Sequence, residues 1–150
     1  MKMEAVAMVR RGWPNEGALD RAELIYAGAT LVNGDWVEKQ SDGTVAKSGA
    51  GANGYVGLVM QGNGDSGSAV NSNKAVVLWS GFTVDISNYD AVPTYVPGSP
   101  LTAKNGVLTL AAVATGAGST YVPADPVVGV VLDVVAVGTS DTAHLTVLVK

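Results

Sequence analysis

The chain has 150 residues, 47% of them hydrophobic and 15% charged, so it can bury a sizeable core in one domain or in two closely packed ones. Its net charge of −4 argues against a nucleic-acid-binding surface, and the absence of cysteine excludes disulfides and thiolate metal sites. The longest apolar run, 127–137, contains Gly129 and Asp133 and is shorter than the ~20 residues of a membrane span. No membrane partner is expected, and the start of the chain does not resemble a secretory signal.

Residues 1–23 are predicted to form an extended N-terminal arm. Gly12-Trp13-Pro14-Asn15 favours a turn, in which Pro14 holds Trp13 in an extended conformation. Trp13 either anchors the arm in a groove of a partner or packs on its own domain, and the sequence leaves both readings open. The residues expected to bind a partner are Met8, Arg10, Arg11, Trp13 and Pro14.

Residues 24–150 are predicted to form a β domain, because short apolar or alternating runs are separated by turn residues. The segment 18–25 is compatible with a helical turn or with a strand entering at Glu23. Phe82–Ile86 alternates with polar residues and is expected to be a half-exposed strand. Asn105-Gly106 favours a tight hairpin turn with two positive φ angles. The remaining expected strands cover residues 36–40, 44–47, 55–60, 75–79, 101–104, 107–110, 127–132 and 145–149.

The two halves of the β domain show the same order of a hairpin, a strand with glycine at its third position, a polar loop and an apolar strand. The glycine-containing strands are residues 55–60 and 127–132, in which Gly57 and Gly129 would mark bulges or close backbone approaches. This pattern predicts an all-β fold, either a compact β-sandwich or a β-barrel, with an internal pseudo-repeat. The approximate halves are 24–90 and 91–150.

Several short motifs match catalytic or binding signatures only as strings. Gly64-Asp65-Ser66-Gly67 is spelled like the nucleophile loop of trypsin-like proteases, but the single histidine, His144, lies downstream. Gly62-x-Gly64-x-x-Gly67 is spelled like a dinucleotide fingerprint, but the sequence that follows it does not favour a helix. Asn63 and Asp65 could hold a weak structural cation, although no glutamate closes the loop. We therefore expect no catalytic, cofactor-binding or metal-binding residues, and we expect that the protein is not an enzyme.

A lone histidine cannot form a zinc site, so His144 is expected to be a half-exposed strand residue. The polar loop 61–73 is long enough to be functional, but its role stays open. Low charge, valine-rich strands, adaptable loops and an arm are together more typical of an assembly component than of an enzyme.

The chain resembles small tailed-bacteriophage capsid decoration (cement) proteins over roughly residues 24–150. The segments that carry the likeness are 98–102 followed by 105–108, the turn and strand start at 32–37, and the strands 128–132 and 145–149. The resemblance implies a structural protein of the virion, made in the host cytoplasm, which binds the outer surface of an icosahedral capsid and bridges neighbouring capsomers. Its implied partners are the major capsid protein and its own copies, most simply as a homotrimer, with no nucleic acid, cofactor or catalytic residue.

Two alternatives remain open from the sequence. One is another virion β protein, such as a tail-tube or head-fibre subunit, which would form rings or fibres. The other is a carbohydrate-binding β-sandwich in which aromatic side chains stack on sugars. The candidate stacking residues are Trp79, Tyr89, Tyr95 and Tyr121.

Overall fold

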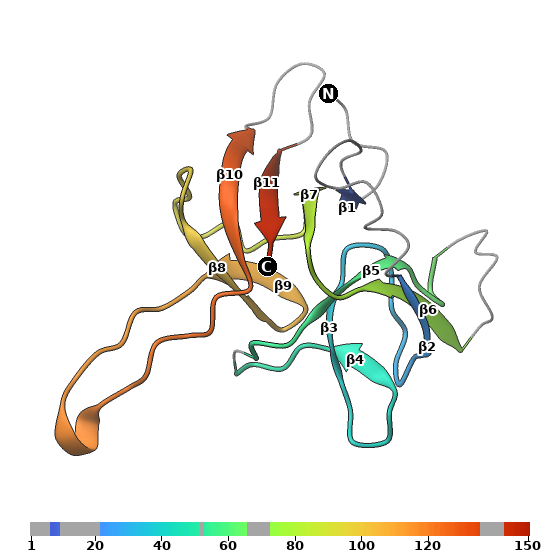
Figure 1. Cartoon of the computed structure of the whole chain (residues 1–150), viewed down its shortest axis with the longest axis horizontal. Coiled ribbons are helices and arrows are strands. Elements are labelled where there is room, and N and C mark those ends of the chain that lie inside the picture. The colour runs from blue at the N-terminus through green and yellow to red at the C-terminus, as the bar shows by residue number, and fades with distance from the viewer. Residues whose placement is uncertain (1–6, 10–21, 52, 66–72, 136–142) are drawn as a thin grey trace.

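The computed structural model describes residues 7–9, 22–51, 53–65, 73–135 and 143–150, and these residues form an antiparallel β protein (Figure 1). The predicted all-β class is confirmed, and the segment before Ala27 is a strand from Glu23, not a helix. A short 3-10 helix, η2 (Gly118–Thr120), lies in a loop. The strands are β1 (Ala7–Val9), β2 (Glu23–Tyr26), β3 (Trp36–Lys39), β4 (Val45–Lys47), β5 (Gly57–Gln61), β6 (Lys74–Leu78), β7 (Phe82–Ile86), β8 (Pro100–Lys104), β9 (Val107–Leu110), β10 (Gly129–Val135) and β11 (His144–Val149).

The strands form two sheets, each of which curls back on itself. One has the order β1-β7-β11-β10-β8-β9 and the other the order β2-β6-β5-β3-β4. In the second sheet, Ala27 at the end of β2 makes a parallel bridge to Val45 of β4. In the first sheet, Tyr89 just after β7 makes a parallel bridge to Leu108 of β9. Of the two predicted architectures, the structure is consistent with the compact β-sandwich of two packed antiparallel sheets, each of which has one parallel bridge between strands that are not neighbours in its order.

The sheet orders confirm the internal repeat. Each sheet contains five consecutive strands of the chain, β2 to β6 in one and β7 to β11 in the other, when β1 is left aside. In both sheets the order of neighbours is the first of these strands, the fifth, the fourth, and then the hairpin formed by the second and third. We call residues 23–78 (β2 to β6) the first repeat and residues 82–149 (β7 to β11) the second repeat. The boundary lies between β6 and β7, ahead of residue 90, because β7 pairs with β11 of the second half. Part of the predicted arm, β1, is an edge strand paired with β7.

The repeat extends to individual residues. Gly57 and Gly129 open equivalent strands, and a bulge follows each at the same spacing. A Cβ at Gly57 would lie 2.4 Å from a methyl group of Val77, and one at Gly129 would lie 2.9 Å from the carbonyl oxygen of Leu148. The predicted bulges therefore follow both glycines, and the predicted close approach is to backbone at Gly129 and to side chains at Gly57.

The turn before the hairpin is also repeated. Gly34 and Gly98 have φ angles of 95° and 93°, and their amides donate to backbone carbonyls of β5 and β10 respectively. The side chains of Asp35 and Ser99 accept hydrogen bonds from the amides three residues earlier, at 2.9 and 3.0 Å. A positive φ favours glycine, and a short polar side chain closes such a turn, so two different sequences build the same geometry.

The hydrophobic core has two parts, and sheet alternation explains why. Inward side chains of the first repeat make one cluster, and those of the second repeat contribute to the other. The opposite face of the first repeat carries a row of cross-strand neighbours on β3, β5 and β6. All of them are fully buried in the cluster that also contains the side chains of the second repeat. We call this row, Trp36, Leu58 and Leu78, the inner row.

The hairpin turn of the second repeat docks on the first repeat next to the inner row. Asn105 and Gly106 have φ angles of 52° and 79°, as predicted for this turn. The carbonyl of Gly106 accepts a hydrogen bond from the amide of Trp36 at 3.1 Å, and its amide donates to the hydroxyl of Ser48 at 2.9 Å. The two repeats are thus joined by backbone hydrogen bonds as well as by apolar packing.

Two burial predictions are wrong. β7 is buried on both faces, including Thr83 and Asp85, and His144 is 3% exposed rather than half exposed. On the face of β7 and β11 away from the core, the hydroxyl of Thr146 donates to the carboxylate of Asp85 at 2.6 Å. Alternation tells which side chains share a face of a strand, but it does not tell whether that face is open to water.

Candidate interaction surface

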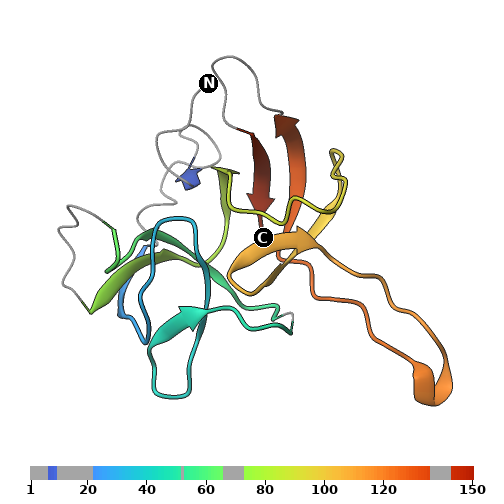
Figure 2. The same ribbon diagram turned by 180° about the vertical axis from the view of Figure 1, so that it is seen from behind.

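A long hairpin projects from the body between β9 and β10. Residues 111–128, which we call the projecting hairpin, extend away from both sheets in two opposite views (Figures 1 and 2). Residues 112–124, 126 and 127 are all exposed. In the first repeat the equivalent connection, 48–56, has half as many residues. The second repeat therefore carries an insertion that the fold itself does not require.

Backbone hydrogen bonds give the projecting hairpin a defined shape. The amides and carbonyls of Thr115 and Val122 bond reciprocally at 2.9 and 2.7 Å. The tip is the 3-10 helix η2, entered through Gly116 at a φ of 76°. A Cβ on that glycine would lie 2.3 Å from the carbonyl oxygen of Thr120. The segment 116–120 is thus the closed tip of a hairpin.

Asp125 fastens the base of the projecting hairpin. Its carboxylate accepts a hydrogen bond from the amide of Ala112 at 2.9 Å and forms an ion pair with Lys104 at 2.9 Å. Its own amide donates to the carbonyl of Ala112 at 2.9 Å. The hydrogen bond from Ala112, followed by that from Lys104, holds the pKa of Asp125 below the usual value of 3.8.

Asp125→Ala is expected to loosen the projecting hairpin without unfolding the body. Amide exchange at Thr115 and Val122 should accelerate in the variant, as hydrogen-exchange mass spectrometry or NMR can measure. The pKa of Asp125 is lower in the folded protein than in the unfolded chain. The stabilisation that its carboxylate gives the projecting hairpin is therefore complete above the ordinary carboxyl pKa and is lost as the pH falls through the lowered value. Wild-type exchange, corrected for intrinsic rates, should therefore accelerate only at strongly acidic pH. Unchanged exchange in the variant at pH 7 would contradict this role.

The projecting hairpin presents apolar side chains to water. Val113, Tyr121 and Val122 are 73%, 56% and 57% exposed. Asp125 is the single charged residue between Ala111 and Val128, and its charge is already paired. Ordered apolar side chains on a hairpin that extends away from the body make it a candidate surface for contact with another protein.

A second exposed apolar surface lies on the outer face of the second repeat. Cross-strand neighbours on β8, β10 and β11 form a row that is equivalent in register to the inner row. We call this row, Pro100, Val130 and Leu148, the outer row. Leu148 is 40% exposed, and Leu132 beside the row is 46% exposed, whereas the inner row is fully buried. The equivalent face is therefore covered in the first repeat and open in the second.

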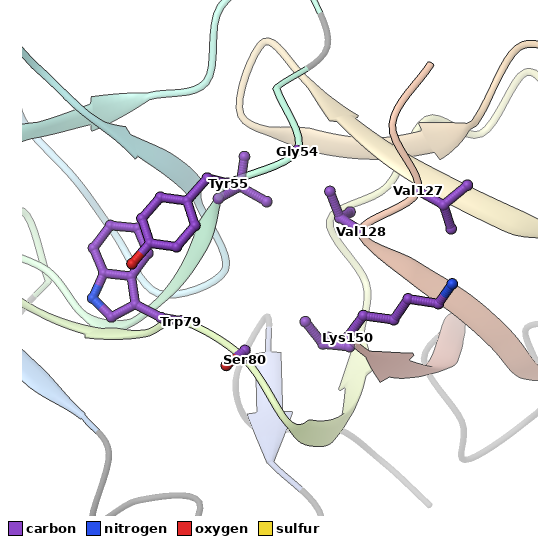
Figure 3. A pocket seen from close by; sticks show the side chains of 9 residues that line it. Gly54, Tyr55, Trp79, Ser80, Val127, Val128 and Lys150 are labelled. Carbon is purple, nitrogen blue, oxygen red and sulfur yellow. The ribbon is translucent and has the colours of Figure 1, made fainter. Parts of the chain in front are cut away.

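A small cleft lies where the two repeats meet (Figure 3). Tyr55 and Trp79 stack at 5.3 Å between ring centroids on one side, with Val127, Val128 and Lys150 on the other. Its volume of about 90 Å³ is well below that of a typical small-molecule site. Lys150 is its single charged lining residue. The cleft offers no arrangement for acid–base chemistry.

The four aromatic residues proposed for sugar stacking do not form one cluster. Tyr89 and Tyr95 pack edge to face at 5.5 Å, and Tyr95 is buried, which raises its pKa to about 12. Trp79 stacks on Tyr55, while Tyr121 lies on the projecting hairpin. No shared platform of these four side chains exists.

The described part of the polar loop, residues 61–65, has a structural role. The carboxylate of Asp65 accepts hydrogen bonds from the amides of Gly62 and Asn33 at 2.6 and 2.9 Å. The amide oxygen of Asn63 accepts from the amide of Leu31 at 2.8 Å. Within the described residues, no group of three or more His, Asp or Glu side chains could hold a metal ion.

The predicted partner-binding residues lie almost wholly outside the described residues. Met8 is in β1, where it pairs in register with Asp85. Arg10, Arg11, Trp13 and Pro14 fall in a segment that the structure does not describe, so their role stays a prediction. Sequence reasoning missed the projecting hairpin, although one signal was available: 111–128 is twice as long as the equivalent connection 48–56.

Comparisons with known proteins add no family assignment. A scan against protein-family models and a search of curated proteins found no match to the chain. In the part of the chain that the structure describes, no helix is long and apolar enough to cross a membrane.

Proposed function

We propose that this chain is a structural virion protein that binds the outer surface of an icosahedral tailed-phage capsid and stabilises it by bridging neighbouring capsomers. The observation that carries the proposal is the projecting hairpin, which holds apolar side chains in water on an ordered, nearly uncharged frame. Such a surface serves protein–protein contact better than catalysis. The resemblance of residues 24–150 to decoration proteins supplies the capsid as the partner.

In this function, many weak contacts combine. Each copy contributes a few apolar contacts, and attachment of several copies as one unit raises the total affinity through effective concentration. The proposed partners are the major capsid protein and further copies of the chain, as a homotrimer at three-fold or quasi-three-fold positions. The N-terminal segment with Trp13 is the proposed capsid anchor, and the proposed location is the capsid surface after synthesis in the host cytoplasm.

The proposal is tested by sedimenting the purified protein with expanded heads of the cognate phage that lack accessory proteins. We expect saturable co-sedimentation, and we expect Trp13→Ala to weaken it at least about tenfold, because a buried tryptophan anchor typically contributes more than 1.4 kcal/mol. Val92→Ser, at a site 91% exposed and outside both the N-terminal segment and the projecting hairpin, is the matched control. Failure of the wild-type protein to sediment with heads would overturn the function. Unchanged binding by Trp13→Ala would overturn only the anchor.

The carbohydrate-binding alternative has one residual feature, the Tyr55–Trp79 stack. Trp79 is fixed by a hydrogen bond from its indole nitrogen to the carboxylate of Glu23 at 2.7 Å, and Tyr55 is 62% exposed. A sugar stacking on Tyr55 would change tryptophan fluorescence, so a titration with glycans separates this reading from the structural one. We expect no saturable change.

A further inference from the structure

The chain has two exposed apolar surfaces that cannot cover each other within one molecule. The projecting hairpin begins and ends beside the outer row, since Ala111 bonds to the carbonyl of Pro100 and Val128 leads into β10. From this base it extends away from the sheets (Figures 1 and 2). Within the described residues, its exposed side chains and the outer row are therefore both open to contact with another molecule.

The internal repeat shows what the outer row is suited to. The inner row occupies the same positions in the first repeat, and there it is fully buried against the second repeat of the same chain. The apolar face that carries the inner row is thus one against which another part of this same chain packs. The outer row keeps its apolar character while remaining open, with Leu148 40% exposed.

The two rows differ at one position, and this difference restricts the kind of contact that can cover the outer row. In the inner row, the amide of Trp36 bonds to the docked turn at Gly106. The equivalent residue in the outer row is Pro100, which has no amide hydrogen to offer. A docked turn held by a backbone hydrogen bond is therefore not repeated at the outer row. A contact made by apolar side chains alone, such as Val113, Tyr121 and Val122 provide, fits it.

We propose that the projecting hairpin of one copy packs on the outer row and Leu132 of a second copy. The charges agree with this pairing, because Asp125 is already paired with Lys104 and the outer row has no charged member. The contact joins two different surfaces and is heterologous, so each copy donates one hairpin and receives another. Such a contact closes into a ring when the rotation between copies allows it. The inference rests on the proposed function, since it names the surfaces that join copies in the proposed oligomer, and it leaves attachment to the capsid to the N-terminal segment.

The test uses two exposed-surface variants of the full chain. The hairpin variant carries Val113→Ser, Tyr121→Ser and Val122→Ser, and the face variant carries Leu132→Ser and Leu148→Ser. Light scattering behind a sizing column should give a closed oligomer for the wild type and a monomer for each variant. Tyr121→Phe and Val92→Ser are controls that should keep the wild-type mass. Circular dichroism checks that each variant is folded.

Mixing the two variants gives the decisive result. The hairpin variant keeps an intact face and the face variant keeps an intact hairpin, so an equimolar mixture should form heterodimers through one restored contact. Each variant should weaken self-association at least about thirtyfold, because truncating the side chains at the centre of a protein–protein contact removes most of its affinity. A monomeric wild type, a variant that keeps the wild-type mass or a mixture that stays monomeric would overturn the pairing. Loss of head binding without any change of mass would assign these surfaces to the capsid protein instead.

Discussion

Trp36→Ala is expected to lower the free energy of unfolding by about 3–5 kcal/mol, as large-to-small changes of buried aromatic residues do. Trp36 is fully buried between the two repeats, and its amide also bonds to the turn at Gly106. The substitution opens a cavity in the layer that joins the repeats. Urea unfolding followed by circular dichroism measures the loss, and a mutant as stable as wild type would contradict the role of the inner row.

Trp36→Phe is the matched control for this prediction. Within the described part of the chain, the buried indole nitrogen of Trp36 has no hydrogen-bond partner. Replacing the indole by a phenyl ring therefore loses packing but removes no hydrogen bond, and it relieves an unpaired donor. The cost should be less than half that of Trp36→Ala. An equal cost would mean that the indole nitrogen has a partner in the folded protein.

Gly62→Ala is expected to destabilise the first repeat by at least about 2 kcal/mol, because overpacking against backbone cannot be relieved by a rotamer change. A Cβ at this position would lie 1.9 Å from the carbonyl oxygen of Leu31 and 2.4 Å from its carbonyl carbon. The loop would have to move away and would strain the hydrogen bond from the amide of Gly62 to Asp65. Thermal unfolding measures the effect.

Gly51→Ala is the control for Gly62→Ala. A Cβ at Gly51 would meet no atom within 4 Å. Alanine there should leave stability unchanged or raise it slightly by restricting the unfolded chain. If both substitutions had the same small effect, the close approach at Gly62 would not constrain the fold. The glycine string at 62–67 would then need another explanation.

Local sequence patterns predicted most strands. A half-buried strand has an apolar side chain at every second position, and a fully buried strand is a short valine-rich run, so both are visible in the sequence. The Asn105-Gly106 turn was predictable from its tolerance of positive φ angles. The repeat was visible in the strands around Gly57 and Gly129. Its boundary was not, because the sheet that receives Phe82–Ile86 depends on long-range pairing with β11.

The candidate interaction surface was less predictable. The sequence of the projecting hairpin looks like a glycine-rich loop, and its shape depends on cross-strand bonds between Thr115 and Val122. The exposure of Leu148 could not be read from its strand, because the equivalent Leu78 has the same pattern and is fully buried. Which of two equivalent faces is covered depends on how the repeats pack, and local sequence does not encode that packing.

The most direct test of the proposed function is a cryo-EM reconstruction of expanded heads of the cognate phage after saturation with the purified protein. We predict added density on the outer surface at three-fold and quasi-three-fold positions, into which the two-sheet body fits. Density at the tail, or heads indistinguishable from untreated ones, would contradict a capsid-stabilising role.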